Sequence, residues 1–198
     1  MYTHADAVRE DGRNKGNYEV DGIRRIPVVS LILHHSAGPE REDWSAEAVI
    51  DEISQIQKDR FYRDYDKDGN FIGYKKSRHT HRCRNEEVFT AYTYLMWMVK
   101  GEWKITATFW GVEENVPGGT SSYVVNSNSI QLCILGNYLD KLPKEGWIDA
   151  IINFFKPKVD DLKAHGFTLE INPHKAFDST PCPGRINEGI PELRKRLS

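Results

Sequence analysis

Histidine and cysteine, two of the side chains that bind zinc most readily, follow predicted strands at two places in this sequence. His34 and His35 follow directly after an apolar run, and His174 precedes Cys182 by eight positions in a loop that contains three prolines. Imidazole and thiolate are preferred zinc ligands, and a catalytic zinc site takes three ligands from the protein and leaves one position for water. A stiff loop suits such a site, because the ligands must be positioned before the metal binds. These residues therefore predict a zinc site.

Each of these two parts of the sequence comes after a predicted strand. Residues 26–33 form a short, mostly apolar and partly β-branched run, which is typical of a strand buried on both faces. Residues 167–171 form a second short strand, and Gly166 just before them is the expected end of a helix. We therefore expect His34 and His174 to follow the ends of two strands.

Strands and helices alternate along the rest of the chain. Further strands are predicted at residues 88–99, 103–109 and 129–135. Helices are predicted at residues 45–60, 147–162 and 191–197, with Ser45 as the N-cap of the first and a kink or interruption of the second at Pro157. This mixture predicts an α/β (α+β) fold, with a single central mixed β-sheet flanked by helices.

The composition narrows the classes of function. The chain has 198 residues, enough for one domain with a buried core, and its 27 Lys and Arg against 29 Asp and Glu give a net charge of −2. A chain this close to neutral is a poor candidate for nucleic-acid binding, and no apolar run reaches the roughly 20 residues that cross a bilayer. We therefore expect no nucleic-acid partner and no membrane insertion. A monomer is also expected, although the composition does not determine the oligomeric state.

The N-terminal residues differ in composition from the rest of the chain. Residues 1–22 are polar and rich in Gly and Asn, so we expect a flexible N-terminal arm, followed by one domain over residues 23–198 with a charged insertion at about 60–90. The first residues lack the apolar core of a signal peptide, so we expect synthesis in the cytoplasm without export by that route.

The three cysteines are too few and too scattered for a disulfide framework.

Two other groups of polar residues resemble metal sites less well. His79, His81 and Cys83 alternate along one predicted strand, but four cationic neighbours disfavour a second metal ion there, so we expect a solvated strand edge. Residues 64–69 begin like a calcium-binding EF-hand loop, but Lys75 stands where the loop requires Glu. We therefore expect a hairpin or loop turn at this place.

Three segments resemble, in order, motifs of the zinc-dependent N-acetylmuramoyl-L-alanine amidases, whose fold is shared by the peptidoglycan recognition proteins and amidase-type phage lysozymes. Residues 31–38, LILHHSAG, resemble the first-strand motif. Residues 126–138, NSNSIQLCILGNY, resemble the N-x-x-S-I-G-I…G-N strand, and residues 174–184 resemble the closing motif of a His, seven residues and then Cys-Pro-Gly. The matches extend over residues 28–186, and their common order and spacing make them specific.

The resemblance implies that His34, His174 and Cys182 bind one zinc ion. His35 comes directly after a ligand in a strand, so its side chain is expected on the opposite face of the sheet and is not counted as a ligand. The resemblance also implies an open position on the metal for the reaction. The same fold is implied for the whole segment from residue 23 to residue 198.

Two further residues are implied to act in catalysis. Tyr92 matches a family tyrosine that faces the metal, with Tyr94 as the alternative because it lies two positions along the same predicted strand. Thr180, two positions before the cysteine, can donate a hydrogen bond to the substrate or to a developing oxyanion. One departure from the family pattern is Gln131, which stands where the family usually has Gly.

The function implied by this resemblance is peptidoglycan hydrolysis, with cleavage of the amide bond between N-acetylmuramic acid and L-alanine by a zinc-activated water. The substrate is peptidoglycan or a muropeptide, and the lack of a signal peptide fits a phage or prophage endolysin that reaches the cell wall after release. The alternative is a non-catalytic peptidoglycan-binding recognition module, but such relatives usually lose a zinc ligand. A cytosolic amidase that recycles muropeptides is disfavoured, because that branch uses Asp in place of Cys.

Overall fold

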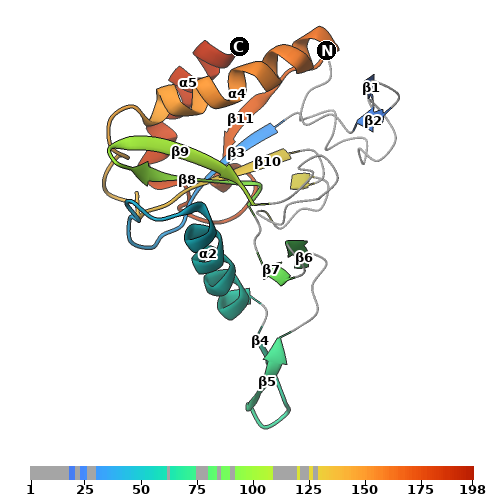
Figure 1. Ribbon diagram of the computed structural model, residues 1–198, viewed down its shortest axis with the longest axis vertical. Coiled ribbons are helices and arrows are strands. Elements are labelled where there is room, and N and C mark those ends of the chain that lie inside the picture. The colour runs from blue at the N-terminus through green and yellow to red at the C-terminus, as the bar shows by residue number, and fades with distance from the viewer. Residues whose placement is uncertain are drawn as a thin grey trace.

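A five-stranded sheet forms the centre of the protein (Figure 1), in a computed structural model that describes residues 18–20, 23–25, 30–61, 63–74, 80–83, 86–89, 92–108, 120, 125–126 and 129–198. The strands lie in the order β11 (Glu170–Pro173), β3 (Ser30–His35), β10 (Ser129–Ile134), β8 (Tyr94–Val99) and β9 (Glu102–Ala107). Neighbouring strands are parallel except for β9, which is antiparallel to β8. This mixed sheet confirms the predicted fold class.

The two strands at the centre of the sheet are those with the most continuous burial. Every residue of β3 and of β10 is buried, as is typical of parallel strands that are covered on both faces. By contrast, β9 lies at the edge and contains only exposed and half-buried residues. His34 therefore lies at the end of a strand that is buried along its whole length.

Helices cover both faces of the sheet (Figure 1), and the α-helices among the described residues are α2 (Ala46–Phe61), α4 (Trp147–Ala164) and α5 (Ile190–Leu197). α4 and α5 pack on one face, in a hydrophobic cluster that includes Leu31 and Leu33 of β3. α2 packs on the opposite face, in a second cluster that includes Cys133 of β10. Because Cys133 pairs in register with His34, that histidine belongs to the face that α2 covers.

Local sequence sets the ends of the long helices. The Ser45 hydroxyl accepts a hydrogen bond from the Ala48 N–H at 3.2 Å, so Ser45 is the N-cap as predicted. Gly166 ends α4 with φ of 84°, and its N–H donates to the Lys163 carbonyl. Of the kink or interruption predicted at Pro157, the interruption is wrong, because α4 runs through this exposed position, where water can replace the lost backbone bond.

The segment 88–99 does not form the single long strand that its composition predicted. Residues Glu86–Phe89 form β7, which pairs with β6 (Thr80–Cys83) in a separate hairpin, and β8 begins at Tyr94. Before β8, two hydrogen bonds join Thr93 to Gln131: the Thr93 N–H donates to the Gln131 carbonyl at 2.8 Å, and the Gln131 N–H donates to the Thr93 hydroxyl at 3.0 Å. Composition could not reveal this break, because it depends on the partner that each half meets.

The strand predicted at residues 167–171 begins three residues later, at Glu170. The Phe167 N–H still donates to the Leu162 carbonyl, at 2.9 Å, in the turn that ends α4. Phe167 therefore belongs to the end of the helix rather than to the strand.

A hairpin of β4 (Arg63–Tyr65) and β5 (Phe71–Tyr74) extends away from the sheet beyond α2 (Figure 1). Its turn is held by Asp66, whose carboxylate accepts bonds from the backbone N–H groups of Asp68 and Asn70, each at 2.9 Å. This confirms the hairpin interpretation of the EF-hand-like sequence.

A short antiparallel hairpin of β1 (Tyr18–Val20) and β2 (Ile23–Arg25) lies at the predicted boundary of the N-terminal arm. Residues 1–17 lie outside the described residues, so the arm over 1–22 and the division of the chain remain predictions. His79 lies outside them too, and of His81 and Cys83 only the backbone in β6 is described. None of the described helices combines the length and the apolar character that spanning a membrane requires.

Candidate metal centre

β3 places its two terminal histidines on opposite faces of the sheet, as strand alternation predicts. His34, which is 1% exposed, lies on the face covered by α2. On the other face, His35 Nδ1 accepts a hydrogen bond from the Tyr138 N–H at 3.1 Å. Only His34 therefore remains available to the loop that contains the other candidate ligands.

The structure brings the three predicted ligands together. β11 lies parallel to β3 and ends at Pro173, so His174 begins the short helix η1 (His174–Ala176) beside the end of β3. The ligand atoms of His34, His174 and Cys182 all lie within 4.8 Å of one another. His34 Nδ1 is 3.9 Å from Cys182 Sγ, and the two imidazole rings have centroids 4.4 Å apart.

Each of the two imidazoles is held through its Nε2 atom. His34 Nε2 lies 2.5 Å from Gln131 Oε1, and His174 Nε2 lies 2.7 Å from Asp178 Oδ2. Metal-binding histidines commonly donate their second ring N–H to an oxygen in this way, which fixes the ring and leaves the other nitrogen for the metal. Sequence reasoning missed Asp178, although its position four residues after His174 in the same loop was the available signal.

Backbone hydrogen bonds hold Cys182 in place. The His35 N–H points at Cys182 Sγ at 3.4 Å, and the Cys182 N–H donates to Thr180 Oγ1 at 3.2 Å. The first of these bonds favours a thiolate. The second shows what Thr180 does in this structure, which is to position the backbone of the cysteine.

The loop that carries Cys182 packs against Tyr138, in the segment that follows β10. After a cis peptide bond between Cys182 and Pro183, Gly184 adopts φ of 65°, and the short helix η2 (Gly184–Gly189) begins. The Arg185 N–H donates to the Tyr138 carbonyl at 2.7 Å. A Cβ at Gly184 would meet that same carbonyl group, with the carbon only 2.7 Å away, so glycine is required both by the backbone angle and by the space.

Burial shifts the proton affinities of the ligands in opposite directions. Loss of solvent, with a smaller effect from nearby His174, lowers the pKa of His34 to about 3, so its imidazole is neutral at physiological pH. Burial raises the pKa of the Cys182 thiol to about 11, against the opposing effect of the His35 N–H. A metal ion would therefore find a ready imidazole and a thiol whose proton it must displace.

Of the two candidate tyrosines, Tyr92 lies beside the ligands. Its ring centroid is 5.1 Å from that of His34, and its hydroxyl is hydrogen-bonded to the side chains of Cys133 and Gln57. Burial raises the pKa of Tyr92 well above its usual value, so the phenol stays neutral. Tyr94 packs against Phe154 and Phe155 on the α4 face, so it is not on the side of His34, contrary to the alternation expected from Tyr92.

The donor set fits zinc. Two imidazoles and one cysteine sulfur are ligand types that Zn²⁺ prefers, and three such ligands are typical of a catalytic site. Within the part of the chain that the structure describes, this is the one group of three His, Cys, Asp or Glu side chains that come so close together. His34, His174 and Cys182 are therefore the residues that would hold a metal ion.

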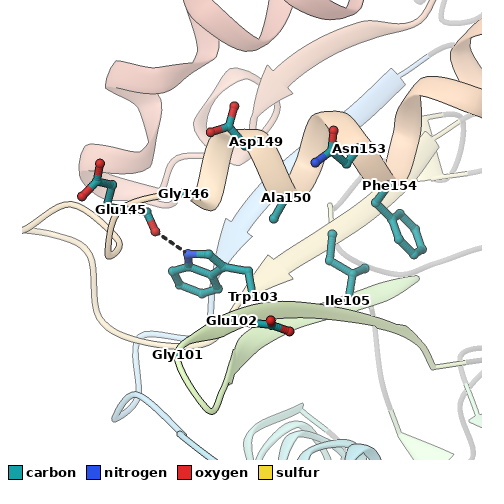
Figure 2. Close-up of a pocket in the computed structure, with 10 residues that line it drawn as sticks. All are labelled: Gly101, Glu102, Trp103, Ile105, Glu145, Gly146, Asp149, Ala150, Asn153 and Phe154. Atoms are coloured by element: carbon teal, nitrogen blue, oxygen red, sulfur yellow. Dashed lines mark hydrogen bonds between the residues drawn. The ribbon is translucent and has the colours of Figure 1, made fainter.

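A groove of about 590 Å³ lies elsewhere, between β9 and α4 (Figure 2). Trp103 and Ile105 point into it from β9 and Phe154 from α4, and Trp103 Nε1 donates to the Glu145 carbonyl at 3.0 Å. None of the three candidate ligands lines the groove. It is a feature of the α4 face, separate from the metal centre.

Comparison with known proteins identifies relatives of this fold by structure alone, since no family model and no curated protein matches the sequence. The Ph2119 endolysin of a Thermus scotoductus MAT2119 bacteriophage is 20% identical, with 94% of this chain and 93% of that chain covered and a TM-score of 0.50. Drosophila PGRP-LB is 17% identical, with 89% and 85% covered and a TM-score of 0.51. Human PGRP-IβC, solved with glycosamyl muramyl pentapeptide, is 15% identical, with 85% and 80% covered and a TM-score of 0.51.

Proposed function

From the fold that this chain shares with a phage endolysin and with peptidoglycan recognition proteins, together with its three candidate metal ligands, we propose that it is a zinc-dependent N-acetylmuramoyl-L-alanine amidase. The observation that supports this proposal best is the convergence of His34, His174 and Cys182, which come from distant parts of the sequence. Three complete zinc ligands are expected of a hydrolase of this fold. A module that only binds peptidoglycan has no need of them.

The side chains around the ligands suggest how the reaction is supported. Zinc, when bound, lowers the pKa of a water molecule and polarises a carbonyl group. Tyr92 keeps its phenolic proton because burial raises its pKa, so it can donate a hydrogen bond to a developing oxyanion. To do so it would exchange its present hydrogen bond to Cys133 for one to the oxyanion.

Thr180 is placed to assist in a different way. Its oxygen accepts the Cys182 N–H, and its own hydroxyl proton remains able to donate to a substrate group. We propose that Thr180 combines the two functions, holding the ligand loop and contacting the substrate. The leaving amine also needs a proton, and no side chain is assigned to that step.

The proposed substrate is peptidoglycan or a muropeptide. The human PGRP-IβC structure was solved with glycosamyl muramyl pentapeptide, which supports a ligand of this kind. Similarity to a phage endolysin over 94% of the chain supports the further proposal of a phage or prophage endolysin. Such an enzyme would be made in the cytoplasm and act on the cell wall after its release.

The proposal is tested by incubating purified peptidoglycan with the protein and measuring new L-alanine amino groups, with and without a chelator, together with the zinc content of the protein. We expect chelator-sensitive release by the wild type. Cys182→Ala should lose both zinc and activity, whereas Cys133→Ala should keep zinc, because this equally buried cysteine is not among the ligands.

Binding of peptidoglycan without release of amino groups would contradict the amidase proposal and favour the recognition module. Activity that persists in a metal-free sample would contradict the zinc chemistry.

A further inference from the structure

Gln131 is the side chain through which β10 reaches the metal centre. It is 0% exposed, and it lies on the α2 face of the strand next to β3, two positions before Cys133. A buried amide must have its donors and its acceptor satisfied, so the direction in which it points is informative. The amide lies between His34 on one side and Ser129 and Asn126 on the other.

The orientation of Asn126 is fixed by the backbone of Thr120. Asn126 Nδ2 donates to the Thr120 carbonyl at 2.9 Å, and Asn126 Oδ1 accepts the Thr120 N–H at 3.0 Å. A carbonyl can only accept and an N–H can only donate, so the two ends of the Asn126 amide cannot be exchanged. The atom that Asn126 turns toward Gln131 is therefore its oxygen.

Asn126 in turn fixes the orientation of Gln131. The Gln131 Nε2 atom lies 3.4 Å from Asn126 Oδ1 and 2.7 Å from Ser129 Oγ, so the nitrogen end of the amide faces these two oxygens. The oxygen end then faces His34, at 2.5 Å from its Nε2 atom. An amide oxygen can only accept, so the proton of this bond must belong to the histidine.

We propose that Gln131 is a positioning residue that holds His34 in the tautomer protonated at Nε2 and so presents an unprotonated Nδ1 to the metal. The opposite tautomer would direct a proton from Nδ1 toward Cys182 Sγ, 3.9 Å away, and would block the ligand position. This inference rests on the metal centre of the proposed function, but not on the reaction or on the substrate.

Gln131 is also the point at which this sequence departs from the pattern that it resembles. Glycine at this position would have no side chain with which to reach His34. The bond that orients His34 is therefore a feature of this chain and is not expected of sequences with glycine at this position. It depends on the hydrogen bonds of Asn126 with Thr120. His174 obtains the same orientation from Asp178, within its own loop.

Two measurements test the proposal on the wild type and on Gln131→Met, which keeps the length of the side chain and removes the amide. The first is the ¹⁵N spectrum of the His34 ring in the metal-free protein, which distinguishes the two tautomers. The second is the affinity for zinc alone, by competition with a chelator. We expect a single Nε2-protonated form in the wild type, and in Gln131→Met a mixture of tautomers and zinc binding weakened roughly 10- to 100-fold.

Two further variants separate orientation from packing. Gln131→Glu keeps an oxygen that accepts from His34, so it should retain the Nε2-protonated form and recover most of the zinc affinity. Ile32→Val removes a methyl group from the buried residue that pairs in register with Gln131, without touching the hydrogen bonds. It should leave both the tautomer and the zinc affinity within about twofold of the wild type.

A wild-type His34 protonated at Nδ1 would overturn the proposal, even if Gln131→Met failed to fold. So would wild-type zinc affinity in Gln131→Met, or an equal loss of affinity in Ile32→Val. Zinc binding with the expected tautomer but without release of amino groups from peptidoglycan would contradict the amidase function and leave this inference standing.

Discussion

Without a metal ion, the His34 imidazole lacks a second proton and the Cys182 thiol keeps its proton. The cause is burial, which lowers the pKa of a base and raises the pKa of an acid. The pKa of His34 is lowered to about 3 and that of Cys182 is raised to about 11. Without a metal ion, His34 and Cys182 are therefore both neutral, which suits their burial. Binding zinc changes this balance by removing the thiol proton.

Zinc affinity should consequently rise with pH. Because the Cys182 proton must leave, we expect the association constant to increase about tenfold per pH unit from about pH 6 to pH 9. The His34 pKa of about 3 adds no proton competition in this range. Cys182→Asp, with a carboxylate that is already ionised there, should have a slope lower by about one. Equal slopes, measured by chelator competition, would show that the thiol is not a ligand.

Tyr92→Phe should lower turnover on peptidoglycan by about 10²- to 10³-fold while zinc remains bound, the range typical of a lost oxyanion donor. The matched control is Tyr94→Phe, the same change on the opposite face of the sheet, where the ring packs against Phe154 and Phe155. The control should keep wild-type turnover. An unchanged rate in Tyr92→Phe would remove this residue from the mechanism.

At the scale of elements, the position of Cys182 depends on the backbone conformation of the loop between η1 and η2. This loop carries Cys182 and leads into η2, which begins at Gly184 in the left-handed region and is bound through the Arg185 N–H to the Tyr138 carbonyl. The segment that follows β10 thus contacts the end of the ligand loop through the Tyr138 carbonyl. The position of Cys182 is fixed by the contact between these two segments rather than by either one alone.

Gly184→Ala should therefore lower both the stability and the zinc affinity. The added Cβ would overlap with the Tyr138 carbonyl group, and we expect a loss of about 3 kcal/mol or more in the free energy of unfolding. Gly166→Ala is the control, because its φ of 84° is also positive but its Cβ would have open space. It should cost about 1 kcal/mol and leave zinc binding unchanged.

These two outcomes can be measured by urea unfolding and by chelator competition on the same preparations. Wild-type zinc affinity in Gly184→Ala would mean that the loop can shift without moving Cys182.

For the whole molecule, the buried imidazoles make folding sensitive to acid. The unfolded chain takes up protons at His34 below its usual pKa of 6.5, but the folded state resists until about pH 3. Burial also lowers the pKa of His35, so its effect has the same sign. The metal-free protein should therefore lose stability as the pH falls from 6.5 toward 3, by at most about 1.4 kcal/mol per pH unit for each group.

The measurement is urea unfolding of the metal-free protein at a series of pH values. His34→Gln removes one of the two groups and should make the dependence on pH shallower. A dependence identical to that of the wild type would contradict the burial of a neutral His34.

The sequence by itself predicted the fold class and most elements, and its resemblance to the amidase motifs implied the candidate ligands. Buried strands and helix ends leave local signals, such as the apolar run before His34, Ser45 before α2 and Gly166 after α4. The spacing of histidine and cysteine in a loop rich in proline is also local information. These features could be predicted because each depends on neighbours in the chain.

Only the tertiary structure decided which groups surround the ligands. The division of residues 88–99 between two sheets, the side of the sheet on which Tyr92 lies, and the contacts of Gln131 and Asp178 with the two imidazoles all depend on what each residue meets. The strand that brings Gln131 to His34 is 97 residues away in sequence. Such contacts are made when β10 pairs with β3, and no local pattern records them.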